Sequence, residues 1–408
     1  MRRLSWFAKA SILITGLAKD PADVFARLRE DDPVSWIPHF DAWVVTRHQD
    51  VQALMADPRL TTDPRAYERH VPSSIEGASR WLDALPFRSA QSDPQSVPRR
   101  LAMGALTPRA VERTELRIRE VVERFAAPLR ERSDVVDLMG EFTTPVSITA
   151  IGRVLGVPPK DADETRFREL ARNATRSIRP LLSDEKRRKS EAASIEICQY
   201  VLNLVHERRT TPMDDMISDL LGASGASTDS EIDDVVKIVS ALVSAGSGTT
   251  GVACARAIRT LFLHPDELAL LRADRSRIAN AVEELLRYDS GLALVPRYVL
   301  EDFELRGRAL KKGQLVALSL FAANRDPRVF ANPDQLDLRR DCKRSMSFGH
   351  GPHYCTGTSV ARIQLRVMLD AALDLLPPQA RLLEKQIRWS ARGFMGQIKT
   401  LPIDFGAR

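Results

Sequence analysis

Cysteine is scarce in this 408-residue chain. Its four cysteines, Cys198, Cys254, Cys342 and Cys355, show no paired spacing. A disulfide framework is therefore not expected, and the usage is typical of a reducing compartment such as the cytoplasm.

Blocks of like charge and long apolar runs are also lacking. The net charge is +6 and is spread along the chain, which argues against nucleic-acid binding but leaves room for an acidic protein partner. No segment beyond the N-terminus reads as long and apolar enough to span a bilayer. With 44% hydrophobic residues and 24 prolines, the composition indicates a soluble globular protein.

Residues 1–19 resemble a signal segment only superficially. Arg2 and Arg3 precede an apolar run, but Lys9 interrupts that run and no small-residue cleavage pattern precedes Asp20. We treat these residues as a leader segment without an assigned role, and expect no export.

Apolar periodicity organises the rest of the chain mainly into helices. Predicted helices cover residues 20–30, 50–56, 111–132, 142–155, 161–178, 184–209, 228–263, 278–288 and 359–376, with strands at residues 43–46 and within 299–320. Residues 61–98 lack periodicity, and a loop of that length is disordered or functional. Residues 222–228 form the only linker-like segment.

The longest predicted helix begins with a capping box, Thr228 with Glu231, and is apolar on all sides over residues 239–243. It is therefore expected to be buried. Gly246 and Gly248 lie inside it, although each glycine costs about 1 kcal/mol in a helix interior. Such weakness predicts a bulge that opens a carbonyl and leaves space for a small ligand.

A glycine-rich loop at residues 348–357 places Cys355 just before the last predicted helix. The partial positive charge at a helix N-terminus stabilises a thiolate, which is the form that binds metals. A single thiolate is unsuited to structural zinc or to an iron–sulfur cluster, but it suits a metal that already has four ligands, such as haem iron. A buried structural cysteine after a tight turn is the alternative.

The loop is similar to the haem-binding loop of the cytochrome P-450 family. The matching positions are Phe348, Gly349, Gly351, His353, Cys355 and Gly357. The resemblance implies a mainly α fold over residues 20–408, a single triangular helical domain with small β-sheets. It also implies haem b (iron protoporphyrin IX) with Cys355 as the iron ligand, and O2 as co-substrate.

The same resemblance implies a haem-thiolate monooxygenase of the soluble bacterial type, acting by hydroxylation or epoxidation, with a role in secondary metabolism. The expected partners are a small apolar substrate and a ferredoxin with its reductase. No bound flavin, nucleic acid or membrane span is expected, and the protein is expected to be a monomer.

Several further residues match family positions that contact haem. Arg99, Arg297 and His353 match groups that bind the propionates, whereas Gln95 stands where the family has a histidine. Ala245 and Gly246 match the oxygen-binding groove.

In that groove Thr249 matches the threonine that helps to deliver protons to dioxygen, and Thr250 matches its usual neighbour. Gly248 stands where the family has an acid. Three readings remain: water ordered by Thr249, with or without Ser247, replaces the acid; the enzyme uses peroxide or performs an atypical reaction; or the protein is a non-catalytic haem ligand-binding protein.

Glu284 and Arg287 match a structural ion pair of the family, with Arg340 as its expected third member. The remaining candidates would line a substrate pocket. They are Trp81, Phe87, Val243, Leu292, Val295, Phe394 and Met395. Trp81 and Phe87 could equally be core anchors.

Overall fold

The computed structural model describes residues 22–38, 40–73, 75–76, 78–81, 108–158, 161–174, 184–289, 291, 293–390 and 397–406. These residues are mainly helical with small sheets, as predicted. The chain divides into two compact units. Unit 1 is Met1–Pro72, Ala255–Cys355 and Leu382–Leu401, and unit 2 is Ser73–Cys254, Thr356–Arg381 and Pro402–Arg408. The single domain expected over residues 20–408 stays a prediction.

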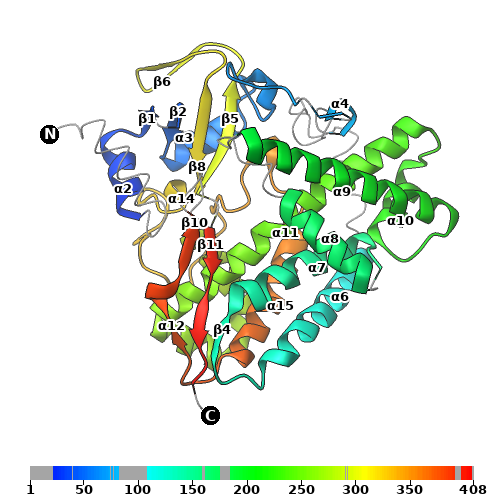
Figure 1. Ribbon diagram of the computed structural model, residues 1–408. Helices are drawn as coiled ribbons and strands as arrows, with labels where there is room; N and C mark the ends of the chain where they lie inside the picture. Colours follow the sequence, from blue (N-terminus) through cyan, green and yellow to red (C-terminus); the bar gives the residue numbers. More distant parts are fainter. Residues whose placement is uncertain are drawn as a thin grey trace. The chain divides into compact units, whose positions relative to one another are not determined.

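A five-stranded sheet organises unit 1, with strand order β1-β2-β8-β5-β3 (Figure 1). The strands are β1 (Val34–Ile37), β2 (Ala42–Val45), β3 (Leu60–Thr61), β5 (Leu294–Val299) and β8 (Leu315–Ser319). All five residues of β8 are buried. Leu315 and Ala317 belong to one hydrophobic cluster and Val316 and Leu318 to another, so β8 is covered on both faces.

Further helices and two pairs of strands belong to unit 1 among the described residues. They are α2 (Ala22–Asp31), α3 (His48–Met55), α12 (Pro265–Ala273), α13 (Ile278–Asp289) and α14 (Leu320–Ala323), with the pairs β6 (Phe303–Leu305) with β7 (Arg308–Leu310) and β10 (Arg388–Ser390) with β11 (Gln397–Thr400). The strand alternation predicted within residues 299–320 is confirmed. Strand β1 was missed because it is only four residues long and lies between two prolines.

Unit 2 is built from helices. They are α4 (Ala78–Trp81), α6 (Pro108–Ala126), α7 (Thr144–Leu155), α8 (Asp161–Ala174), α9 (Asp184–Thr210), α10 (Met216–Ser224), α15 (Thr358–Leu375) and α11 (Asp229–Leu263) as far as Cys254. Helix α6 packs on α7 and α15, and α8 packs on α9 (Figure 1). Strands β4 (Val135–Asp137) and β12 (Pro402–Asp404) pair antiparallel.

Helix α11 confirms the predicted capping box and length. The Thr228 N–H donates to Glu231 Oε2 at 2.9 Å, and the Glu231 N–H donates to Thr228 Oγ1 at 3.4 Å. We expected no segment beyond the N-terminus to be long and apolar enough to span a bilayer. That expectation was wrong, because α11 is both long enough and apolar enough. However, 61% of its most apolar window is buried inside the protein, as in the core helix of a folded domain.

Three sequence predictions need correction. The linker at residues 222–228 was placed too early, because α10 continues to Ser224 before Gly225 turns the chain with φ 61°. The helix predicted to residue 132 ends as α6 at Ala126, where a 3-10 turn containing Pro128 follows. The bulge predicted in α11 was also wrong, because the helix stays α-helical throughout Asp229–Leu263.

The close approach of α11 to α7 gives a reason for a glycine in the helix. A Cβ atom added at Gly251 would lie 2.8 Å from the Thr143 carbonyl oxygen and 3.2 Å from Ser147 Cβ. Real Cβ atoms essentially never show the first distance, which involves backbone that cannot move aside cheaply, and the second is tighter than nine in ten real Cβ contacts. Glycine therefore lets these two helices pack in unit 2.

We expect Gly251→Ala to destabilise the protein by about 1–3 kcal/mol, the usual cost of overpacking, as measured by chemical denaturation. Gly222→Ala is the matched control. It lies inside α10 with nothing within 4 Å of the added Cβ, so it should stabilise by roughly 0.5–1 kcal/mol. Equal stability of the two variants would contradict the close packing of α11.

Candidate functional site

The glycine loop at residues 348–357 is held by its own backbone. The Cys355 N–H donates to the Phe348 carbonyl at 3.0 Å, and the Gly349 N–H donates to the Met346 carbonyl at 2.8 Å. Gly349 and Gly351 have φ angles of 79° and 69°, a region that favours glycine. The loop is thus a folded turn that fixes the backbone of Cys355.

Gly351 is also required by what lies beside it. A Cβ atom there would be 3.1 Å from Ala56 Cβ and 3.5 Å from the Met55 carbonyl oxygen. The loop therefore rests on the end of α3. After Cys355 the chain enters α15, whose N-cap is Gly357 and whose first carbonyl bond is Ala361 N–H to Gly357 O at 2.9 Å.

The four thiols have different surroundings. Cys355 is exposed, whereas Cys198, Cys254 and Cys342 are buried. Burial raises the pKa of Cys198 to about 11 and that of Cys254 to about 12. For Cys342, burial and then the nearby Glu284 carboxylate raise the pKa. These three thiols stay protonated at neutral pH. Because Cys355 is the exposed thiol of the four, it is the one accessible to a ligand or metal.

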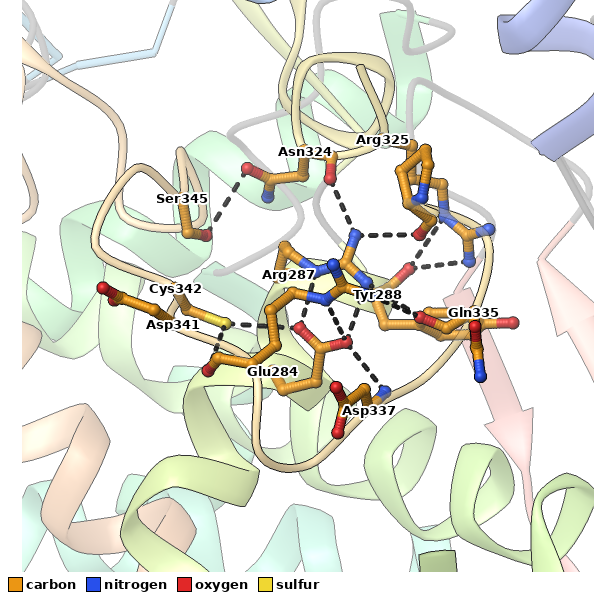
Figure 2. Close-up of polar contacts among 12 residues, drawn as sticks. Glu284, Arg287, Tyr288, Asn324, Arg325, Gln335, Asp337, Asp341, Cys342 and Ser345 are labelled. Atoms are coloured by element: carbon orange, nitrogen blue, oxygen red, sulfur yellow. Dashed lines mark hydrogen bonds and ion pairs between the residues drawn. The ribbon is translucent and has the colours of Figure 1, made fainter. Parts of the chain in front are cut away.

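A buried ion-pair cluster lies elsewhere in unit 1 (Figure 2). Arg287 Nε and Nη2 donate to the two carboxylate oxygens of Glu284 at 2.6 and 2.8 Å, and both side chains are 0% exposed. Arg340 Nε donates to Glu284 Oε1 at 3.1 Å. The structure therefore brings together the three residues that the sequence grouped.

The cluster has further members that sequence reasoning missed. The Cys342 thiol donates to Glu284 Oε2 at 3.2 Å, and the Asp337 N–H donates to Oε1 at 3.1 Å. Arg287 Nη1 donates to the carbonyls of Asn324 and Pro333 at 2.8 and 2.9 Å. Only the fold reveals them, since no local sequence pattern pairs these residues with Glu284.

Arg297 is a buried cation on β5. Burial lowers the pKa of its guanidinium to about 10. Its Nη1 donates to the Pro296 carbonyl at 2.9 Å, and within the described part of the chain no ion pair with a carboxylate is found for it. Because a buried charge without a counter-ion is costly, an anionic group would stabilise this position.

His353 lies half-buried in the cysteine loop. Gln95 and Arg99 lie outside the described residues.

One face of the middle of α11 is accessible. Ala245 and Thr249 are exposed, and Leu242, Gly246 and Gly248 are half-buried. Thr249 Oγ1 donates to the Ala245 carbonyl at 2.8 Å. Its proton is therefore engaged and its lone pairs remain as acceptors.

The opposite face of α11 is closed. Val243 is 0% exposed and Thr250 is buried. Ser247 Oγ is also buried and donates to the Val243 carbonyl at 2.6 Å. Ser247 therefore does not share the accessible face with Thr249. Val243 also points away from it, and Leu242 occupies the position that a helical period of about 100° per residue assigns to that face.

The other pocket candidates are placed only in part. Trp81 in α4 is 3% exposed, and the Arg80 guanidinium stacks 4.4 Å from its ring centroid while pairing with Asp233 at 2.7 Å. Val295 on β5 is half-buried. The remaining candidates, Phe87, Leu292, Phe394 and Met395, lie outside the described residues.

Known proteins resemble this chain over most of its length. The family model described as Cytochrome P450 matches residues 35–376. The Vitamin D(3) 25-hydroxylase of Pseudonocardia autotrophica is 33% identical, covering 86% of this chain and 85% of its own. The Epothilone C/D epoxidase of Sorangium cellulosum is 30% identical, and the match covers 89% of this chain and 87% of the epoxidase.

A solved structure extends the likeness to the fold. The complex of P450BioI with an acyl carrier protein ligated to hexadec-9Z-enoic acid aligns with a TM-score of 0.84 at 27% identity. It covers 98% of this chain and 100% of that one. The family model matches most of the chain, and two relatives are at least 30% identical to it. These matches establish both the fold family and the class of reaction. The chain belongs to the cytochrome P450 family and is a monooxygenase.

Proposed function

We propose that this chain is a haem-thiolate monooxygenase that inserts one oxygen atom of O2 into an apolar organic substrate, with Cys355 as the iron ligand. The observation that carries the proposal is the contrast among the four thiols. Cys355 is exposed on a hydrogen-bonded loop before α15, and the other three are buried. A metal ligand needs a thiol that is accessible and whose backbone is fixed.

The buried charge of Arg297 supports haem as the bound group. Arg297 has a buried charge that calls for an anion, and the propionates of haem b would provide it, with Arg99 and His353 as further contacts. When bound, haem ligated by a thiolate supplies the O–O cleavage that the reaction needs. No separate flavin is required within this chain.

Thr249 would hold a proton-carrying water. Its hydroxyl proton is donated to the Ala245 carbonyl, so Thr249 Oγ1 accepts a hydrogen bond from water. Gly248 adds no acid, and Ser247 is bonded on the closed face. We therefore assign the ordering of water to Thr249 alone.

The partners follow from the same proposal. Electrons would come singly from a ferredoxin and its reductase, the protein would act as a cytoplasmic monomer, and the substrate would belong to secondary metabolism. The relatives named for vitamin D(3) and epothilone support a large, mostly apolar substrate that undergoes hydroxylation or epoxidation.

We expect Thr249→Ala to lower the product formed per NADH consumed at least about tenfold, because removing a positioned proton-transfer group costs at least this much in rate. The measurement compares product with NADH consumption in the presence of a ferredoxin and its reductase. Thermal unfolding of the same variant checks that the helix is intact.

A peroxide-driven reaction is the second candidate, and Gly248 favours it. In that case Thr249→Ala should leave turnover with hydrogen peroxide unchanged, because peroxide already brings both protons and electrons. A large loss of peroxide turnover in this variant would exclude the peroxide-driven reading.

The experiment that tests the proposed function is a titration of the purified ferric protein with macrolides, terpenoids, steroids and fatty acids, followed by haem absorption. A low-to-high-spin shift would identify the substrate class. Absence of a shift with free compounds but a shift with an acyl carrier protein conjugate would indicate a carrier-bound substrate. If the ferrous carbon monoxide complex lacks a thiolate-type spectrum, the proposed function is wrong.

A further inference from the structure

Asn324 lies just after α14 and its side chain is fully buried. Its Oδ1 accepts the Met346 N–H at 2.6 Å and the Ser345 hydroxyl at 3.4 Å. Its Nδ2 donates to Ser347 Oγ at 3.0 Å, and the two serine hydroxyls lie 2.7 Å apart. One carboxamide therefore fixes three consecutive residues.

These three residues lead directly into the cysteine loop. The Met346 carbonyl accepts the Gly349 N–H at 2.8 Å, and the Phe348 carbonyl accepts the Cys355 N–H at 3.0 Å. A displacement of Met346 would thus move the Gly349 turn and the carbonyl that holds Cys355. No side chain of residues 345–347 carries a charge, so hydrogen bonds are the main directional restraint on this segment.

The backbone of Asn324 is tied to the ion-pair cluster. Its carbonyl accepts Arg287 Nη1 at 2.8 Å (Figure 2). Its N–H donates to the Leu320 carbonyl at 2.9 Å. The same residue therefore contacts the rigid Glu284–Arg287 pair through its main chain and the segment before the cysteine loop through its side chain.

We propose that Asn324 is a positioning residue for the Cys355 thiolate, transmitting the fixed position of the Glu284–Arg287 pair to the cysteine loop. The proposal rests on the proposed function, because it assumes that Cys355 is the iron ligand. An apolar side chain would fill the same space, but it would leave the buried Met346 N–H without this acceptor, which is costly.

The test compares Asn324→Ala with Ser319→Ala. Ser319 Oγ caps the same short helix, accepting the Ala322 N–H at 3.1 Å and donating to the Ala293 carbonyl at 3.2 Å. Both residues are 0% exposed, but Ser319 has no recorded bond to residues 345–355 among those that the structure describes. The control therefore perturbs α14 without cutting the connection to the loop.

Two readouts are measured on the haem-containing protein: amide hydrogen exchange at Met346 and Cys355, and the ratio of thiolate-type to thiol-type ferrous carbon monoxide spectra. For Asn324→Ala we expect both the protection of these amides and the spectral ratio to fall about tenfold, the effect of losing one buried hydrogen bond. Ser319→Ala should leave both unchanged, even if thermal unfolding shows a similar loss of stability.

Equal changes in the two variants would overturn the proposal, since Asn324 would then only stabilise the fold. If Asn324→Ala does not fold, Ser347→Ala replaces it, because it removes one partner of the carboxamide from the loop side. Wild-type-like exchange and spectra in Ser347→Ala would likewise count against the proposal. Failure of the proposed function is distinct, because the wild-type protein itself would then lack the thiolate-type spectrum.

Discussion

A Cys355→Ser variant should lose the thiolate-type carbon monoxide spectrum and at least about 100-fold of its monooxygenase turnover. A hydroxyl is a much weaker acid than a thiol and does not supply the anionic sulfur whose electron donation favours O–O cleavage. Removing even one group that stabilises developing charge costs about 10²–10³ in rate, and an iron ligand should cost no less. The measurements are the ferrous carbon monoxide spectrum and product formation at saturating ferredoxin.

Cys198→Ala is the matched control for this loss. Cys198 is buried, and its pKa is raised to about 11, so it should contribute packing only. The control should keep its spectrum and turnover while losing some stability. The assignment of Cys355 as the iron ligand would be wrong if the thiolate-type spectrum survived in Cys355→Ser or disappeared in Cys198→Ala.

Features whose signals are local in sequence were predictable. The glycines of the cysteine loop predict left-handed turns, and the structure has Gly349 at φ 79° and Gly351 at φ 69°. The capping box of Thr228 and Glu231 likewise depends on a spacing of three residues. In both cases the chemistry and the partner lie within a few residues.

Features that depend on distant partners were not predictable. Cys342 meets Glu284 across 58 positions, and Asn324 meets Met346 across 22. Gly251 is needed because another helix approaches it. Weak helix formers in α11 predicted a bulge, but the buried contacts keep the helix regular. Tertiary packing overrode local propensity there.

Glu284→Gln should produce the largest loss of stability, about 3–5 kcal/mol, because it leaves the Arg287 charge buried without its partner. Arg287 and Glu284 are both 0% exposed, and Arg340 loses the same carboxylate. Glutamine keeps the shape of the side chain but not its charge, so the loss reports electrostatics and not a cavity. The measurements are the free energy of unfolding in denaturant and the haem content of the purified protein.

Glu30→Gln supplies the same chemical change at an exposed pair. Glu30 Oε2 lies 2.5 Å from Arg328 Nη2, and the two side chains are 45% and 47% exposed, so this variant should cost about 1 kcal/mol or less. The difference between the two variants isolates burial, since the substitution is identical. If Glu284→Gln costs no more than Glu30→Gln, the cluster does not stabilise unit 1. The Glu284–Arg287 pair would then not be the fixed element from which Asn324 positions the cysteine loop.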